Sequence, residues 1–320
     1  MSIKKRKKSI SPLICIIPIA AAMLFTVFSY NKYHDLSLAL QEEEKIIISA
    51  NSPSKGTGRG FSGLELFSSN AVLFDPNSGD ILYGKDPNEI IYPASLTKIM
   101  TALVAIENID DLDRSVTLKY ADYAGLYEQN AAMAGFSLGE TVTVRDLLYA
   151  TLLPSGAEAA TALANAAAGS NENFVALMNE RAISLDMNNT HFVNVTGLHD
   201  DDHYTTVSDL SLLLKEASKN RDFMEPYTTL RYTTTATQQH PQGLKLTSTL
   251  VPRLAQLNRD REPIIGNKTG YTEEAQLCLA SIAEKDGKRL ALITVGAEGD
   301  GRSHPTQLED AYLLYGKALK

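Results

Sequence analysis

Apolar runs separated by turn residues occur at both ends of the chain beyond about residue 68, and helical patterns fill the sequence between them. Residues 71–74 and 81–83 flank one turn, and residues 277–283 and 290–295 flank another, which is typical of two β-hairpins. Helical periodicity is found over 97–107, 144–153, 157–168, 173–185, 208–218 and 306–319. This order indicates an α+β domain whose antiparallel sheet is assembled from both ends of the domain.

The N-terminal sequence has the pattern of a membrane segment. No residue from 12 to 30 is charged, and basic residues occupy 4–8. A helix over 12–30 spans about 28 Å at about 1.5 Å per residue, close to the thickness of the hydrocarbon core. The basic cluster predicts that the N-terminus stays in the cytoplasm. We therefore expect 1–30 to be an uncleaved membrane anchor or, alternatively, a cleaved signal peptide, with the remainder extracytoplasmic.

The next segment, 31–67, differs in composition from the part with regular hairpin and helix patterns. It contains a charge run at 42–45, and 52–63 is rich in Ser, Gly and basic residues. This composition predicts a flexible tether, although a helical stalk over 36–48 is an alternative for its first half. The expected organisation is therefore an anchor or signal peptide (1–30), a tether (31–67) and one folded domain (68–320).

Charge and cysteine content exclude several functions. The formal net charge is −8 even though 4–8 is basic, so the body of the protein is acidic. An acidic body without a basic stripe argues against a nucleic-acid partner. Two cysteines, Cys15 and Cys278, cannot form a disulfide framework or supply a four-ligand zinc site by themselves.

A Ser-x-x-Lys motif is the first candidate for chemistry. The motif occurs at Ser2, Ser52 and Ser95, but only Ser95 stands at the start of a predicted helix. The i, i+3 spacing places Ser95 and Lys98 on one helix face, where an amine held out of water can accept the hydroxyl proton. The alternative is an N-cap serine beside a solvated lysine.

A Lys-Thr-Gly motif at Lys268 is the second candidate. It follows the apolar residues 264–265 and precedes the closing hairpin, so it is expected on a strand beside that hairpin. Lys268 can attract a carboxylate, Thr269 can hydrogen-bond it, and Gly270 leaves room for a peptide backbone. The alternative is a surface strand that leads into a turn.

Longer segments extend both motifs and carry a family resemblance. YPASLTKIMTAL (92–103), NKTGYTEEAQLCLA (267–280) and the block 174–213 are similar to the serine D-Ala-D-Ala carboxypeptidases, the low-molecular-mass penicillin-binding proteins that trim peptidoglycan stem peptides. The resemblance runs from about Leu64 to Leu319. It implies a β-lactamase/transpeptidase-like fold, with the nucleophile on a helix between the sheet and an all-helical lobe.

The resemblance also implies roles for individual residues. Ser95 would attack the carbonyl of the penultimate D-Ala, Lys98 would be its base, and Ser155 would relay protons. The backbone N–H groups of Ser95 and Tyr271 would hold the oxyanion. The partners implied are stem peptides ending in D-Ala-D-Ala and, as covalent inhibitors, β-lactams. No cofactor is expected, and the uncharged segment 12–30 adds the membrane as a partner. The substrate-binding residues would be Lys268, Thr269, Gly270 and Tyr271.

One position departs from the family pattern. The family usually has Ser-x-Asn, whereas this chain has Ser155-Gly156-Ala157 followed by Glu158. Losing one aimed hydrogen bond typically costs about 1–3 kcal/mol, which is about one to two decades in rate. A catalytically weak penicillin- or peptidoglycan-binding protein is therefore an alternative to the carboxypeptidase. A β-lactamase of the same fold is a further alternative, but the Glu base expected shortly before Leu and Asn is not visible.

A His-rich segment offers a different hypothesis. His199 and His203 flank three aspartates, and such a cluster could bind a divalent metal. No His-Glu-x-x-His helix accompanies it, so we expect an exposed polar turn and no metal site.

Overall fold

The computed structural model describes residues 58, 60–61, 63–299 and 304–320. All of these residues belong to one compact unit. Its main sheet has five strands in the order β2-β1-β9-β8-β7, and every neighbouring pair is antiparallel. The strands come from both ends of the unit, as expected: β1 (Asn70–Phe74), β2 (Ile81–Lys85), β7 (Ile264–Thr272), β8 (Gln276–Lys285) and β9 (Lys288–Ala297).

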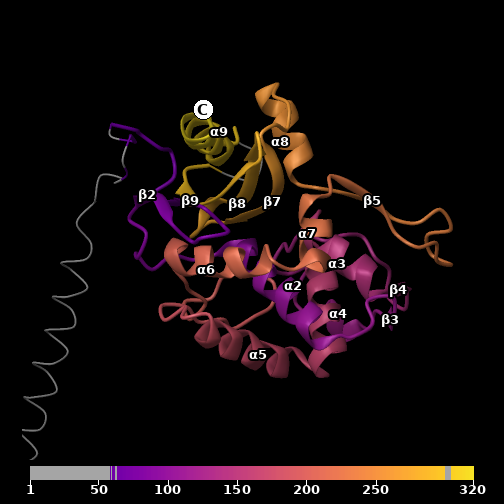
Figure 1. Ribbon diagram of the computed structural model, residues 1–320. Coiled ribbons are helices and arrows are strands. Elements are labelled where there is room, and N and C mark those ends of the chain that lie inside the picture. The colour runs from indigo at the N-terminus through magenta and orange to yellow at the C-terminus, as the bar shows by residue number, and fades with distance from the viewer. Residues whose placement is uncertain (1–57, 59, 62, 300–303) are drawn as a thin grey trace, which may run out of the picture. The chain divides into compact units, whose positions relative to one another are not determined.

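The two faces of the sheet pack against different helices, as Figure 1 shows. Side chains alternate along a strand, so Ala71 and Leu73 of β1 belong to one apolar cluster and Val72 and Phe74 to another. The first cluster lies under α9 (Thr306–Ala318), which packs on β8 and β9. The second cluster joins the opposite face to the helical lobe. The predicted α+β fold is therefore confirmed.

The helical lobe surrounds one enclosed helix. All residues of α2 from Thr97 to Ala105 are buried, because α2 packs against α3, α4, α5 and α6. The bounds of the helices between β2 and β7 are η1 (Ala94–Leu96), α2 (Thr97–Asn108), η2 (Tyr120–Asp122), α3 (Val144–Leu152), α4 (Ala157–Ala168), α5 (Asn171–Ser184), α6 (Val207–Ala217), α7 (Arg221–Thr228) and α8 (Leu250–Leu257).

Helix ends in this lobe follow from capping residues in the sequence. Thr143 and Asp146 form a reciprocal capping box at the start of α3, and Ser170 and Thr206 cap α5 and α6 through their hydroxyl groups. Gly169, at φ +80°, ends α4 in the left-handed conformation that glycine tolerates best. These local signals explain why most helices begin and end within a few residues of their predicted limits.

Two small two-stranded sheets were not predicted. One joins β3 (Ser115–Thr117) to β4 (Thr141–Thr143). The other joins β5 (Arg231–Thr233) to β6 (Lys245–Thr247), and it extends to one side in Figure 1. Three-residue strands carry too little periodicity to be recognised from sequence.

The N-terminal predictions fall largely outside the described residues. The candidate anchor at 12–30 and most of the tether are not described, and no helix within the described part is long and apolar enough to cross a membrane. Phe61 is buried with its ring centroid 5.5 Å from that of Tyr83, and Leu64 and Leu66 pack on the same cluster. The boundary at 67/68 stays a prediction, although packed side chains occur before it.

Candidate active site

Ser95 lies in the tight turn that leads into α2. The turn η1 is preceded by Pro93, and Ala94 has φ +45°, an uncommon conformation for a residue with a side chain. Ser95 itself is only partly buried, so its hydroxyl reaches the adjoining cavity.

Lys98 follows one turn later and faces the serine, as the spacing predicts. Its Nζ lies 3.1 Å from Ser95 Oγ and donates a hydrogen bond of 2.6 Å to the backbone carbonyl of Thr196. The side chain is 2% exposed. Burial lowers the pKa of Lys98 from 10.5 to about 7, with a smaller opposing effect from the negative charge of Glu158. The solvated-lysine alternative is therefore wrong, and the amine beside the hydroxyl group can lose its proton near pH 7.

Ser155 and Lys268 form a second serine–lysine pair in the same site. Ser155, at φ +67°, lies in the turn between α3 and α4, and its Oγ accepts a 2.8 Å hydrogen bond from Lys268 Nζ. The same ammonium group donates to the carbonyl of Thr269 at 2.7 Å. Lys268 is fully buried, and burial together with the positive charges of Lys98 and Arg253 holds its pKa well below its usual range.

Strand β7 brings the Lys-Thr-Gly motif to the nucleophile. It is an edge strand that pairs with β8 alone within the described sheet, so its other edge faces the cavity. A Cβ atom added to Gly270 would lie 3.1 Å from the Ser95 nitrogen and 3.1 Å from the Ala94 Cβ. A side chain at this position would therefore push its neighbours away by a few tenths of an ångström, and glycine allows the close approach. Tyr271 follows at the cavity wall.

The cavity between these elements has a volume of about 590 Å³, and its lining includes Ser95, Lys98, Ser155, Thr269, Gly270 and Tyr271. Lys268 lies beneath the lining. A larger hollow of about 1300 Å³ adjoins this cavity and shares Gln129, Thr196 and Leu198 with it. The structure thus brings the sequence-predicted site residues together, and their individual roles stay predictions.

Arg253 of α8 is a cavity residue that sequence reasoning missed. Its guanidinium has no hydrogen-bond or ion-pair partner among the described residues, and its Nε is buried. Burial lowers the pKa of Arg253, although a guanidinium remains charged at neutral pH. A partly buried guanidinium without a partner at a cavity wall favours an anion in the cavity. No local motif marks Arg253, because α8 is brought to the cavity only by the tertiary fold.

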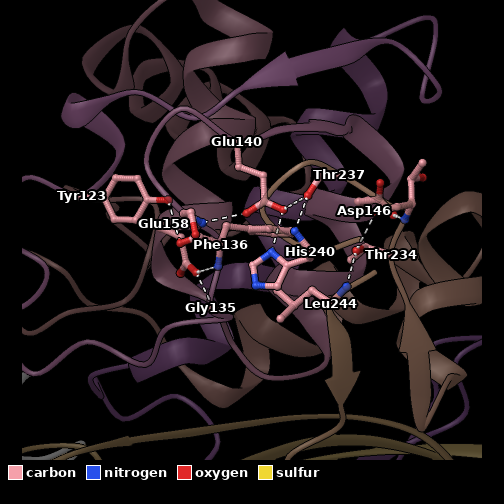
Figure 2. Close-up of polar contacts among 12 residues, drawn as sticks. Tyr123, Gly135, Phe136, Glu140, Asp146, Glu158, Thr234, Thr237, His240 and Leu244 are labelled. Atoms are coloured by element: carbon pink, nitrogen blue, oxygen red, sulfur yellow. Dashed lines mark hydrogen bonds and ion pairs between the residues drawn. The ribbon is translucent and has the colours of Figure 1, made fainter. Parts of the chain in front are cut away.

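Two buried carboxylates hold the loop between η2 and β4, whose residues 129–132 form another wall of the cavity. Glu158 Oε1 accepts hydrogen bonds of 2.8 Å from the N–H groups of Ala134 and Gly135, and Figure 2 shows it directed at this loop. Glu140 accepts hydrogen bonds from Thr237 at 2.6 Å and from His240 at 2.8 Å, which fixes the loop to the segment between β5 and β6. Glu158 therefore supports the wall and does not replace the missing amide at position 157.

The expectation of an exposed turn over 199–203 is only partly right. His199 lines the cavity with a side chain that is 29% exposed, and its ring meets that of Tyr92 edge-on at 4.7 Å. His203, by contrast, is 2% exposed because it packs under the nucleophile turn and bonds Thr97. No cluster of three or more metal-ligating side chains occurs within the described part of the chain.

Comparison with known proteins yields one consistent family. The family model described as D-alanyl-D-alanine carboxypeptidase matches residues 57–299. The D-alanyl-D-alanine carboxypeptidase DacF of Bacillus subtilis is 33% identical over 248 residues, which cover 76% of this chain and 61% of the relative. The D-alanyl-D-alanine carboxypeptidase of Streptomyces sp. strain K15 is 33% identical over 258 residues, covering 76% of this chain and 84% of the relative.

Solved structures agree with these sequence relatives. The Streptomyces K15 DD-transpeptidase superposes with a TM-score of 0.72 at 29% identity, covering 80% of this chain and 98% of that one. A D-alanyl-D-alanine carboxypeptidase of Mycobacterium tuberculosis superposes with a TM-score of 0.70 at 27% identity, covering 80% of this chain and 92% of that one. The chain spans only about three-fifths of the Bacillus subtilis relative, so the similarity covers only that part of the relative.

Proposed function

Because this chain belongs to the D-alanyl-D-alanine carboxypeptidase family, we propose that it removes the terminal D-Ala from peptidoglycan stem peptides through an acyl-enzyme on Ser95. One observation carries this proposal: the buried Lys98 amine, with a pKa of about 7, lies 3.1 Å from the Ser95 hydroxyl at the edge of a cavity. A base whose pKa is close to the working pH is the arrangement that nucleophilic catalysis by serine requires.

Acylation begins when Ser95 Oγ attacks the carbonyl carbon of the penultimate D-Ala and its proton passes to Lys98 Nζ. The backbone N–H groups of Ser95 and Tyr271 are assigned to hold the oxyanion, and the close approach of Gly270, the residue before Tyr271, to the Ser95 nitrogen supports this assignment. The C–N bond then breaks, and the departing D-Ala nitrogen takes a proton from Ser155 Oγ. Lys98 Nζ passes the proton it took from Ser95 to Ser155 and is neutral again, while Lys268 Nζ, 2.8 Å from Ser155 Oγ, holds that hydroxyl in place by a hydrogen bond.

Deacylation uses the same groups in reverse order. Water attacks the ester carbonyl, Lys98 Nζ accepts its proton, and Ser95 Oγ leaves with a proton returned by Lys98. The products are the shortened peptide and free enzyme, so atoms and charge balance.

Recognition of the terminal carboxylate is assigned to Arg253 and Thr269. Lys268 is fully buried, and its Nζ already donates hydrogen bonds to Ser155 and to a backbone carbonyl. Its hydrogen bonds are therefore made within the protein. Thr269 Oγ1 lies 2.7 Å from Thr249 Oγ1 at the cavity wall, and the Arg253 guanidinium is unpaired among the described residues. Carboxylate binding, first expected of Lys268, thus passes to Arg253 and Thr269, and Lys268 positions Ser155.

Replacing Arg253 by glutamine is expected to lower kcat/KM for a peptide ending in D-Ala-D-Ala by about tenfold to a hundredfold, mainly through KM. The reason is that a hydrogen bond to a charged group is worth about 1.5–3 kcal/mol. The measurement compares this peptide with its C-terminal amide, and the variant should lose the preference for the free carboxylate.

Arg259→Gln is the matched control for this prediction. Arg259 lies just beyond the same helix with its guanidinium 4.8 Å from the Tyr312 ring, outside the cavity lining. The control should keep the wild-type preference. If Arg253→Gln also keeps it, the carboxylate is bound elsewhere.

The function itself is tested by incubating the full chain with a fluorescent penicillin and, separately, with a D-Ala-D-Ala peptide. Covalent labelling together with release of D-Ala is the expected result. Labelling without release would contradict the carboxypeptidase and indicate a protein that only binds penicillin. No labelling and no release would overturn both.

The remaining partners follow from the substrate. Peptidoglycan lies outside the cytoplasm, so the proposed activity places the catalytic domain there, and β-lactams would acylate Ser95 as covalent inhibitors. We further propose that 12–30 attaches the protein to the membrane, as its hydropathy and the preceding basic residues predict. Protease protection of the full chain in vesicles, with 12–30 replaced by a polar sequence as the comparison, tests this assignment.

A further inference from the structure

The segment 193–203 packs against the nucleophile turn at several points. His203 is buried, with its Nε2 2.8 Å from Thr97 Oγ1 and its Nδ1 accepting a 3.1 Å hydrogen bond from the Val193 N–H. Gly197, at φ +78°, lies so close to Ala94 that an added Cβ atom would be 1.8 Å from the Ala94 carbonyl oxygen. This segment therefore contacts the turn directly and also through Thr97.

The hydrogen bonds define the proton positions in this cluster. Because Nδ1 of His203 accepts from a backbone N–H, the neutral ring carries its proton on Nε2 and donates to Thr97 Oγ1. Thr97 Oγ1 in turn donates to the carbonyl of Ala94 at 2.8 Å. The result is a directed chain from His203 through Thr97 to Ala94, the residue before Ser95.

The neutral state of His203 persists at working pH. Burial lowers its pKa to about 4, an effect that Asp200 opposes and that His191, His199 and Lys98 reinforce. The ring therefore stays neutral near pH 7, and the Nε2–H donor is retained.

Ala94 needs an external restraint because of its backbone. At φ +45° it occupies a conformation that is strained for a residue with a side chain and persists only when its surroundings hold it. The carbonyl that Thr97 bonds belongs to this residue, and the next residue is the nucleophile. The backbone N–H of Thr97 donates to the same carbonyl, so the Thr97 hydroxyl adds a second hydrogen bond at the residue before Ser95.

We propose that His203 and Thr97 are positioning residues that hold the turn at Ala94 and thereby orient Ser95 for attack. The proposal rests on the carboxypeptidase function proposed above. The same segment supplies the Thr196 carbonyl that holds Lys98 Nζ at 2.6 Å. Segment 193–203 thus restrains both members of the Ser95–Lys98 pair in a chain whose position 157 lacks the usual amide.

The test compares Thr97→Val with Thr97→Ser in the full chain. Stopped-flow acylation by a fluorescent penicillin separates the maximal acylation rate from the half-saturating concentration. Thr97→Val, which is nearly isosteric, should lower the maximal rate by about tenfold to a hundredfold and leave the half-saturating concentration within about twofold. Thr97→Ser keeps the hydroxyl and should remain within about threefold of the wild type.

Thr101→Val is the matched control. Thr101 lies one turn further along α2, is equally buried, and donates a 2.7 Å hydrogen bond to Val195 of the same segment, but it does not touch Ala94. It should lose thermal stability to the same extent as Thr97→Val while keeping the acylation rate. Equal loss of acylation in the two valine variants, or none in Thr97→Val, overturns the proposal.

His203→Leu supplies an independent measurement. If His203 acts through Thr97, the double variant His203→Leu/Thr97→Val should acylate no more slowly than the slower single variant. Losses of rate that multiply in the double variant would contradict this hydrogen-bonded chain. If His203→Leu does not fold, the three threonine variants still decide the question. Wild-type protein that fails to acylate at all refutes the proposed function instead, so the two failures are distinguishable.

Discussion

Ser95→Ala is expected to abolish covalent labelling by penicillin and to reduce D-Ala release by at least about 10⁴-fold. The reason is that Ser95 is the partly exposed serine beside the Lys98 amine, whereas Ser155 is buried. Ser155 bonds Lys268 on the far wall, and burial raises the pKa of the Cys278 thiol to about 12. Intact-mass spectrometry after incubation with penicillin, together with a D-Ala release assay, measures both effects.

Two variants serve as controls for this result. Ser52→Ala removes the serine of another Ser-x-x-Lys motif, which lies outside the described residues, and labelling should be unchanged. Thermal unfolding of Ser95→Ala should match the wild type, because Ser95 is only partly buried and its hydroxyl accepts one hydrogen bond. Labelling that persists in Ser95→Ala would falsify the assignment of the nucleophile.

Lys98→Met is expected to lower the acylation rate by about 10³-fold, within the range of about 10²–10⁴ that a general base contributes. Methionine matches the length and apolar stem of lysine, so it fills the buried space without supplying a base. Lys98→Arg is the informative comparison, because arginine keeps the positive charge but cannot give up its proton near neutral pH. Both variants should lose activity, and acylation that survives in Lys98→Arg contradicts the base role.

The pH dependence of acylation follows from the same lysine. Only the neutral amine accepts the Ser95 proton, and the pKa of Lys98 is about 7. Below pH 7 the acylation rate should therefore fall about tenfold for each pH unit, and above pH 8 it should level off. A profile that is flat between pH 5 and pH 8, measured with penicillin in the full chain, would show that another group limits the reaction.

Stability should depend on pH for a related reason. Folding lowers the pKa of Lys98 from 10.5 to about 7, so between these values the unfolded chain binds more protons than the folded one. Stability should consequently rise with pH across this window. Lys268, with its pKa lowered in the same direction, adds to the slope. Urea unfolding of Lys98→Met from pH 7 to pH 9 should show a shallower rise than the wild type; an equal rise contradicts the lowered pKa.

Much of the fold was predictable because its signals are local. Period-two apolar runs and turn residues indicated β1, β2, β8 and β9, and capping residues marked the ends of the main helices. The elements that were missed, such as α8 and the three-residue strands, are short. Arg253 was missed with α8, since a single arginine on a short helix has no pattern that points to a site.

The sequence by itself determined the α+β order of elements and the Ser95/Lys98 and Lys268 motifs, because alternation, capping and i, i+3 spacing act over a few residues. Only the tertiary structure decided the hydrogen-bond partners and the pKa values of these groups. It placed the Thr196 carbonyl against Lys98, Lys268 against Ser155, and His203 beneath Thr97, across sequence separations of 98, 113 and 106 residues. Burial at those contacts lowers the lysine pKa values, and burial is a property of the packed chain that no local pattern contains.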